Sequence, residues 1–233
     1  MRYIVGVMFV LSIGAGPMSL PAFSQARGRS TVSLAAVQNR PLGALGHNIS
    51  FGYGITGALT IPLDRSGRLS IRAEVGEMEY GHESRRTAFS ATVGDRVEVM
   101  VRTTNAVVPI TLGLQGELSF GPLAVYAHGG IAAQAFYTTT RIEPTAGGYP
   151  LVSSVNQSDL AFGWNLGSGV SIPVHTGTRQ VLLDFGAQYI AGGRASYLAP
   201  GSIVDHPDGQ VTITPLESRT PMLAIRAGVR IGL

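Results

Sequence analysis

Apolar and small side chains alternate over long segments of this sequence, and that alternation restricts the chain to β structure. Between Ile49 and Leu63, the odd positions carry Ile, Phe, Tyr, Ile, Gly, Leu, Ile and Leu, whereas the even positions carry Ser, Gly, Gly, Thr, Ala, Thr and Pro. Successive side chains of a strand point to opposite faces, and a helix cannot produce this sorting. The pattern therefore predicts a strand with one apolar face and one face of small side chains.

The same alternation, interrupted by turns rich in Gly, Pro and Asp, predicts eight strands. They cover residues 29–37, 47–63, 68–80, 105–119, 123–137, 159–174, 180–190 and 220–233. In the third strand the apolar pattern shifts to Met78 and Tyr80. This shift indicates a bulge near Gly76 and places both side chains on the apolar face.

The connections between these strands alternate in length. Short turns follow the second, fourth and sixth strands, whereas long polar segments follow the third, fifth and seventh, at 81–104, 138–158 and 192–219. Short turns at one end and long loops at the other are typical of transmembrane β-barrels, and the clear strands exceed the ~9–11 residues needed to cross a bilayer. The sequence therefore predicts an all-β, eight-stranded antiparallel transmembrane β-barrel with short periplasmic turns and long extracellular loops.

Composition excludes several kinds of site. Charged residues make up only 13% of the chain, well below the ~25% that is usual in soluble domains. The absence of cysteine excludes disulfides, thiolate metal sites and a cysteine nucleophile. The 5 histidines show no metal-ligand spacing, and a net charge of +3 is too small to indicate nucleic-acid binding. We therefore expect no cofactor, no metal and no nucleic-acid partner.

The N-terminal segment 1–26 has the three parts of a secretory signal peptide. Arg2 supplies the positive charge, residues 3–13 form an apolar core, and residues 17–26 are small and end in sites that fit the cleavage rule. Beyond this segment no run of ~18 apolar residues occurs, so no membrane-spanning helix is expected. The barrel is therefore expected to occupy residues 27–233 of an exported protein.

The C-terminal strand carries the pattern Arg226-x-Gly228-x-x-Ile231-x-Leu233. It resembles the C-terminal assembly signal of bacterial outer-membrane barrels, in which a polar residue and a glycine precede two spaced apolar residues. The family usually ends on Phe or Trp, whereas this chain ends on Leu. The resemblance implies that these four residues form the insertion signal and that the barrel-assembly machinery is a partner.

Segments 108–118 (VPITLGLQGEL), 121–133 (GPLAVYAHGGIAA) and 162–170 (FGWNLGSGV) extend the resemblance to the whole mature chain. They look like the small outer-membrane β-barrels of Gram-negative bacteria, the OmpA/OmpX-type and "porin-family" proteins. The resemblance implies a monomer in the outer membrane, in contact with its lipid and lipopolysaccharide. It also implies a non-enzymatic structural, adhesive or surface-binding role carried by the long outer loops.

Charged side chains on the face opposite the apolar one are expected to point into the lumen. The interior of an eight-stranded barrel holds little more than its own side chains, and a buried charge is costly unless it is paired. We expect two ion pairs between neighbouring strands, Asp184 with Arg230 and Arg72 with Glu117. The predicted lumen is therefore plugged by side chains.

Two further features have both a functional and a structural interpretation. Arg85, Arg86 and Arg96 lie in the second outer loop, where guanidinium groups can bind lipopolysaccharide phosphates or simply be solvated. Residues 52–57 match the dinucleotide-binding pattern G-x-G-x-x-G, which requires a helix N-terminus. Because these glycines lie within an alternating strand, we interpret them as lumen-facing positions.

Two other classes of protein are weighed against this interpretation. An outer-membrane enzyme that modifies lipid A needs a histidine beside a serine and an acid, but no His-x-Ser pair occurs, and His128 is expected to be a hydrogen-bonded lumen residue. A soluble lipocalin-like barrel needs a charged exterior, whereas the non-apolar face here is mostly small and uncharged. We expect Leu166→Arg on the apolar face to be costly and Gly167→Ser to be much milder.

Overall fold

The computed structural model describes most of the chain outside the N-terminal segment. The described residues are 28–88, 98–145, 149–176, 179–206 and 210–233. The predicted signal peptide, residues 1–26, lies outside them.

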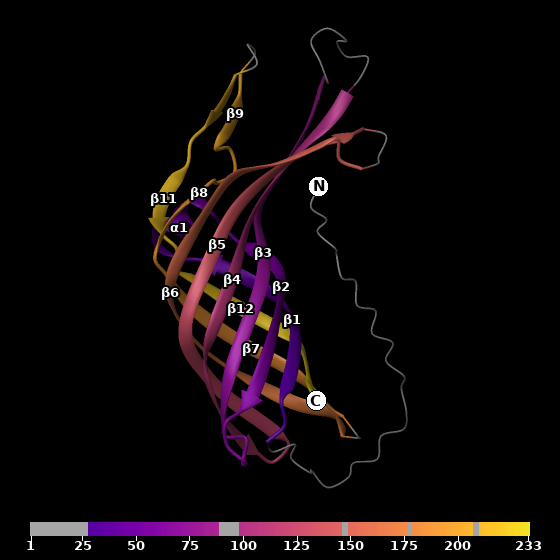
Figure 1. Ribbon diagram of the computed structural model, residues 1–233, viewed down its shortest axis with the longest axis vertical. Helices are drawn as coiled ribbons and strands as arrows, with labels where there is room; N and C mark the ends of the chain where they lie inside the picture. Colours follow the sequence, from indigo (N-terminus) through magenta and orange to yellow (C-terminus); the bar gives the residue numbers. More distant parts are fainter. Residues whose placement is uncertain (1–27, 89–97, 146–148, 177–178, 207–209) are drawn as a thin grey trace.

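Eight strands close into an antiparallel barrel in the order β1-β12-β7-β6-β5-β4-β3-β2, which confirms the predicted fold class (Figure 1). They are β1 (Thr31–Pro41), β2 (Gly52–Pro62), β3 (Leu69–Ala88), β4 (Glu98–Phe120), β5 (Leu123–Pro144), β6 (Val152–Thr176), β7 (Gln180–Gly192) and β12 (Met222–Gly232). The seam pairs the first strand with the last, with Val32 opposite Ile231. Closure leaves no strand edge in the barrel wall that lipid would have to hydrogen-bond.

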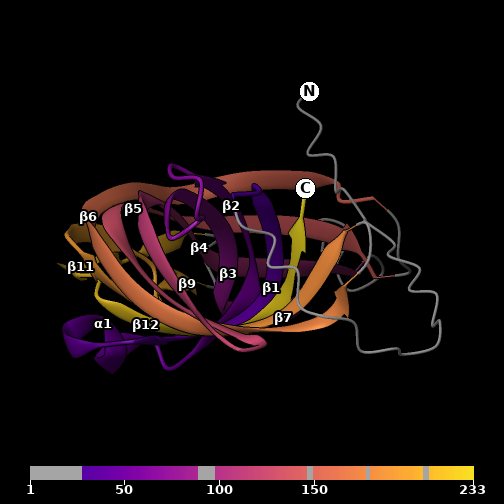
Figure 2. The ribbon, with the colours of Figure 1, turned by 90° about the horizontal axis from the view of Figure 1, so that it is seen from below.

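The remaining elements are short and lie at the extracellular end. They are α1 (Gly43–Asn48), β8 (Arg194–Tyr197), β9 (Ile203–Asp205), β10 (Val211–Ile213) and β11 (Leu216–Arg219). β8 pairs with β11 and β9 with β10, so the predicted loop 192–219 contains strands. Residues 47–51, predicted as strand, are instead the end of α1 and a connection to β2. Figure 2 shows α1 and β11 on the same side of the barrel.

No helix in the described part of the chain is long and apolar enough to cross a membrane.

Two of the predicted outer loops are largely strand. The register aligns Gly81, Asn105, Thr138 and Gln157 across β3, β4, β5 and β6, and pairing continues above this level. We call the part of these four strands at and above that level the projecting sheet; it rises beyond the rest of the barrel in Figure 1. Its sequence is polar and rich in threonine, a residue that favours strands without producing an apolar alternation.

The barrel presents its apolar side chains outward. Ile55 is 61% exposed and Leu166 60%, whereas Thr56 and Asn165, one position along, are 6% and 4% exposed. Soluble proteins rarely expose a continuous apolar surface, whereas membrane barrels carry such a belt against lipid. The predicted assignment of the two faces is therefore confirmed for these strands.

The bulge predicted near Gly76 is wrong. Met78 and Tyr80 are 2% and 7% exposed and face the lumen, because β3 keeps its alternation through Gly76. The register instead shifts between Glu79 and Gly81, where the projecting sheet begins. Large apolar side chains on the inner face of β3 thus belong to the interior of the barrel.

The turn between β2 and β3 is fixed by one carboxylate. The Ser66 hydroxyl and the Leu69 backbone amide donate hydrogen bonds to Asp64, the latter at 2.9 Å. These two bonds lower the pKa of the Asp64 carboxyl. Gly67 has a φ of 68°, a backbone conformation that other residues rarely adopt. The turn therefore positions the periplasmic ends of two strands with few residues.

Candidate functional site

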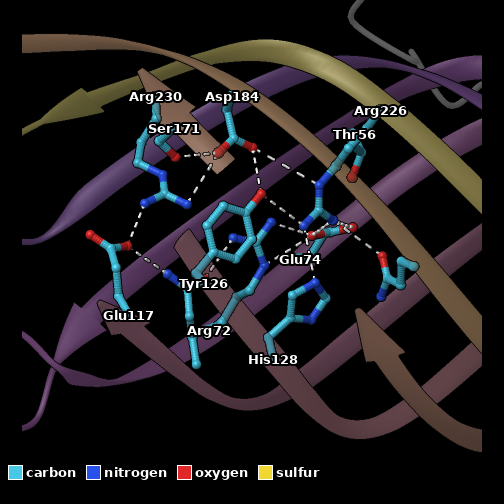
Figure 3. A network of polar contacts seen from close by, with 12 residues as sticks. Thr56, Arg72, Glu74, Glu117, Tyr126, His128, Ser171, Asp184, Arg226 and Arg230 are labelled. Carbon is cyan, nitrogen blue, oxygen red and sulfur yellow. Dashed lines mark hydrogen bonds and ion pairs between the residues drawn. The ribbon is translucent and has the colours of Figure 1, made fainter. Parts of the chain in front are cut away.

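A network of charged side chains occupies the periplasmic half of the lumen (Figure 3). It contains three guanidinium groups and three carboxylates, which balance in charge: Arg72, Arg226, Arg230, Glu74, Glu117 and Asp184. Five of these side chains are at most 9% exposed, and only Glu117, at 27%, reaches solvent appreciably. All point inward because they fall on the same parity as the small residues.

Arg226 contacts both sides of the lumen from β12. Its Nη1 lies 3.0 Å from Glu74 Oε2 on β3, and its Nη2 lies 3.3 Å from Tyr126 Oη and 3.0 Å from His128 Nε2 on β5. A guanidinium only donates hydrogen bonds, so His128 accepts at Nε2. This predicted lumen histidine is therefore a structural acceptor, and Arg226 connects strands that are not neighbours.

The structure brings the predicted pair Asp184 and Arg230 together, with Nη2 and Oδ1 3.2 Å apart. Asp184 also accepts hydrogen bonds from Tyr126 Oη at 2.9 Å and Ser171 Oγ at 2.7 Å. Arg230 makes a second ion pair, with Glu117 at 2.7 Å, and its guanidinium lies 4.6 Å from the centre of the Tyr126 ring. The carboxylate and guanidinium are thus each held by several partners.

The predicted pairing of Arg72 with Glu117 is wrong. Arg72 pairs with Glu74 on its own strand, at 2.5 Å, and donates to Gln115 Oε1 at 3.1 Å. The register places Arg72 opposite Gly113, so Glu117 lies about 13 Å farther along β4 at ~3.3 Å per residue. Glu117 is therefore at a different depth, where it meets Arg230 instead.

Glycines opposite the large lumen side chains make room for them. A Cβ added at Gly167 would collide with the His128 imidazole and lie 2.8 Å from the Ala187 carbonyl oxygen. One added at Gly186 would lie 2.9 Å from Arg226 Nε and 3.0 Å from Tyr126 Oη. The expectation that Gly167→Ser is mild is therefore wrong, because a backbone atom as well as a side chain blocks the space.

Residues 52–57, the G-x-G-x-x-G match, lie within β2 and not at a helix N-terminus. Gly52 and Gly54 face the lumen, and a Cβ at Gly52 would meet Asn39 Oδ1 at 2.7 Å. Gly52 and Gly54 therefore permit close packing of the barrel interior, as predicted, whereas Gly57 lies on the outward-facing parity of β2.

The extracellular half of the lumen is filled by an apolar cluster. Its largest fully buried members are Leu45, Val107, Phe136, Ile190, Tyr197 and Met222. The Phe136 ring lies 6.1 Å from Tyr80 and 5.9 Å from Tyr197, so residues from β3, β5 and β8 pack together. The lumen of this barrel is therefore divided into a charged layer in its periplasmic half and an apolar layer in its extracellular half.

The segments α1, β8 and β11 form a lid over the apolar cluster. Asn48 Nδ2 donates to Tyr197 Oη at 3.0 Å, and the same hydroxyl lies 3.1 Å from Ser218 Oγ. At its root, Thr220 Oγ1 donates to Gln134 Oε1 at 2.8 Å inside the barrel. The hydrogen bonds of three loop segments thus converge on the buried Tyr197, which lies against the barrel interior.

Cavities lie along the part of the lumen that the structure describes. One, of about 10 Å³, lies between the charged and apolar layers beside Arg226 and Ile190. This volume is about what one water molecule needs. The other, of about 280 Å³, opens at the periplasmic mouth and has Arg230 and Glu117 among its lining residues.

His128 and Ser171, the histidine and a serine of the described lumen network, bond to other partners and not to each other. His128 contacts Arg226 and, at 3.4 Å, Asn165, whereas the Ser171 hydroxyl donates to Asp184. A serine nucleophile needs a base within hydrogen-bond reach, and this serine is bonded to a carboxylate that two arginines already engage. No group of three or more His, Cys, Asp or Glu side chains is placed to hold a metal in the ranges that the structure describes.

Of the three predicted lipopolysaccharide contacts, the structure describes Arg85 and Arg86, and these two do not share a face. Arg85 and Arg86 lie near the upper end of β3 and are exposed, whereas Arg96 lies outside the described residues. Arg86 is opposite Met100 on β4, and Arg85 is opposite Val101. Because neighbouring residues of a strand point to opposite faces, Arg85 and Arg86 lie on different faces of the projecting sheet.

The four residues of the predicted assembly signal all lie at the seam. Arg226 belongs to the lumen network, and a Cβ at Gly228 would meet Ala35 on β1. Ile231 is opposite Val32, and the Leu233 amide donates to the Ser30 carbonyl at 2.9 Å. These residues therefore close the barrel, whereas their recognition by an assembly machinery stays a prediction.

The fold and its two faces define the class of protein. A closed eight-stranded antiparallel barrel, with an apolar belt outside and charged side chains inside, is built to span lipid and satisfies all wall hydrogen bonds internally. The protein is therefore a small β-barrel of the outer membrane.

Comparisons with known proteins give matches to solved structures. No protein-family model and no curated protein sequence matches the chain. Among solved structures, surface protein A of Neisseria aligns over 88% of this chain and 97% of its own, with 15% identity and a TM-score of 0.43. Ail, the attachment invasion locus protein of Yersinia pestis, aligns over 88% and 99%, with 12% identity and a TM-score of 0.41. A major outer membrane protein from Thermus thermophilus aligns over 88% and 99%, with 13% identity and a TM-score of 0.45.

Proposed function

We propose that this protein is a non-enzymatic outer-membrane barrel with a sealed lumen, and that it acts by presenting the projecting sheet for binding at the cell surface. The observation that carries the proposal is the continued pairing of β3, β4, β5 and β6 beyond the level of Gly81, up to Ala88 opposite Glu98. At ~3.3 Å per residue, this pairing extends the strands on the order of 20 Å.

The projecting sheet has the properties of a binding surface and not of a flexible loop. Thr103 and Thr140 hydroxyls lie 3.1 Å apart across β4 and β5, and Asn156 Nδ2 donates to Thr140 at 2.6 Å. Its margin also exposes apolar side chains, with Tyr149 95% exposed and Val155 63% exposed. A rigid sheet that carries exposed aromatic and aliphatic groups loses little conformational entropy on binding.

Lipopolysaccharide is proposed as a second partner, through a different set of arginines from the one predicted. Arg102 on β4 is directly opposite Arg141 on β5. Two residues from Arg102 on the same strand, Met100 is opposite Arg86 on β3, so Arg86 lies on the same face as the other two arginines. Like charges directly opposite each other destabilise a sheet, so an anionic partner would relieve this repulsion. Glu143 reaches Arg102 only at 3.9 Å and leaves Arg141 for a phosphate.

The sealed lumen is supported by both of its layers. Ion pairs cross and line the charged layer, and the lid covers the apolar one, with Tyr197 only 1% exposed. Because the lumen is filled, a partner in water can bind this barrel only at its two ends. The projecting sheet is the surface at the extracellular end.

Trimming the sheet tests this proposal. Residues 83–103 and 140–154 are replaced by short turns, and cells that carry the trimmed protein are assayed for adhesion to surfaces coated with extracellular-matrix proteins. We expect a folded, heat-modifiable barrel in the outer membrane and a loss of adhesion. A matched variant that removes 203–213, which holds β9 and β10, is expected to adhere like wild type. Equal adhesion by the trimmed and wild-type proteins would contradict the surface-binding role.

A further inference from the structure

We propose that the periplasmic mouth of the barrel is a binding site for a small anion that carries two or more carboxylate or phosphate groups. This site lies at the opposite end from the projecting sheet and does not depend on the proposed surface role. It is the 280 Å³ cavity, which approaches the ~300 Å³ lower limit of small-molecule sites. Its walls come from the periplasmic ends of the strands and their turns.

The charges that line this cavity do not balance. Arg29, Arg68 and Arg230 line it, whereas Glu117 is its one carboxylate among the residues that the structure describes. Glu117 is already engaged by Arg230 at 2.7 Å, and Arg230 is engaged by Asp184 as well. Within the described ranges no carboxylate forms an ion pair with Arg29 or Arg68. The rim therefore carries two guanidinium groups that can bind an anionic ligand.

The acidic residue nearest in sequence does not compensate them. Asp64 lies in the same turn as Arg68, but it does not line the cavity, and its carboxylate accepts hydrogen bonds from Ser66 and the Leu69 amide. Guanidinium groups bind carboxylate and phosphate oxygens in pairs of parallel hydrogen bonds. Arg29 and Arg68 thus supply the recognition chemistry for an anion with at least two charged groups.

Hydroxyl groups deeper in the cavity add neutral donors. Thr60 lines the cavity, is only 6% exposed, and its hydroxyl has no hydrogen-bond partner in the described structure. That oxygen is itself closed to solvent, so a ligand in the cavity would reach it only after neighbouring side chains move. Ser70 and Ser119 line the same cavity. The site therefore combines cationic groups at the rim with hydroxyl-bearing residues on its walls.

Binding is measured by isothermal titration calorimetry on the purified full chain in lipid nanodiscs at low ionic strength. Pyrophosphate and citrate are the two probes, and they separate a phosphate ligand from a carboxylate one. We expect binding of at least one probe, and Arg29→Gln with Arg68→Gln should weaken it about tenfold or more, since two charge-assisted contacts are lost.

Arg65→Gln is the matched control, because Arg65 lies in the same turn and is exposed but does not line the cavity. It should leave the affinity unchanged. Heat-modifiability of each variant confirms that the barrel is folded. The absence of binding by both probes would overturn the proposal. Equal weakening by Arg65→Gln and the double substitution would also overturn it, because it would show general attraction to positive charge.

Discussion

Arg230 Nη1 lies 2.7 Å from Glu117 Oε2, although β12 and β4 are on opposite sides of the barrel. The contact spans the full width of the lumen. Arg226 makes a similar crossing to Glu74 on β3, at 3.0 Å. Ion pairs that join distant strands stabilise the closed barrel as a whole, because separating the strands would leave charges unpaired in a narrow interior.

The pair Asp184 and Arg230 should be energetically coupled. Asp184→Ala removes a carboxylate that engages Arg230, Tyr126 and Ser171, so we expect it to lower the free energy of unfolding by about 3–5 kcal/mol. Adding Arg230→Ala should recover part of this loss, with a coupling of about 1–3 kcal/mol.

Urea unfolding of the four proteins of this cycle in lipid vesicles measures the coupling. Recovery should be incomplete, because the second substitution leaves Glu117 without its guanidinium. Strictly additive losses would show that the two side chains do not interact.

The cost of placing a charge on the outward face should differ between positions that face lipid and positions that face water. Leu166 and Val152 lie on the same strand and are 60% and 54% exposed, but only Leu166 is in the apolar belt. Leu166→Arg should cost about 2–4 kcal/mol, because it places a charge near the bilayer centre.

Val152→Arg, in the projecting sheet, should change the free energy of unfolding by less than about 0.5 kcal/mol. Refolding into lipid vesicles in a urea series measures both variants. Equal losses would mean that the belt does not face lipid.

Gly167, which faces the lumen, and Gly57, which lies on the outward-facing parity of β2, should differ in their tolerance of a methyl group. Gly167→Ala pushes a Cβ against His128 and a carbonyl oxygen, and we expect a loss of about 1–3 kcal/mol from overpacking. Gly57→Ala is the control, since the nearest atom to its Cβ is the Ser33 carbonyl oxygen at 3.8 Å. Urea unfolding compares the two, and a tolerant Gly167 would show that the interior is looser than the structure indicates.

Removal of Ile231–Leu233 should prevent closure of the barrel. The deletion removes the pairing of Ile231 with Val32 and the hydrogen bond from Leu233 to Ser30, and it leaves strand edges that lipid cannot satisfy. We expect exported protein that stays in the periplasm without heat-modifiability. Ile231→Val should assemble normally. Wild-type amounts of the deletion variant in the outer membrane would refute the assembly role.

The alternation of side chains was sufficient to predict the barrel wall, and the reason is physical. A strand between lipid and a narrow lumen must be apolar on one face and small or paired on the other, so Arg72, Asp184 and Arg230 could be assigned to the interior from parity alone. The projecting sheet extends beyond the apolar belt, and its sequence is polar. Its segments therefore lack apolar alternation and looked like loops.

Depth inside the barrel could not be predicted in the same way. Parity shows which face a side chain occupies, but its height relative to distant strands depends on the stagger of the whole sheet. The contact between Arg226 and Glu74 was missed for this reason. The predicted pairing of Arg72 with Glu117 failed because the register of the neighbouring strands β3 and β4 places Arg72 opposite Gly113. The sequence pattern assigns Arg226 only to the assembly signal. Arg226 and Glu74 both fall on the lumen-facing parity of their strands, and this shared parity is the signal that could have indicated their contact.

Electrical recording from a planar bilayer tests the central claim, a lumen sealed by its own side chains, most directly. Purified wild-type protein is reconstituted, and a porin of known conductance in the same bilayer serves as the positive control. The charged layer and the covered apolar layer leave an internal cavity of only about 10 Å³ between them. We therefore expect no stable single-channel steps from the folded, heat-modifiable protein. Stable, porin-like steps would contradict the sealed lumen.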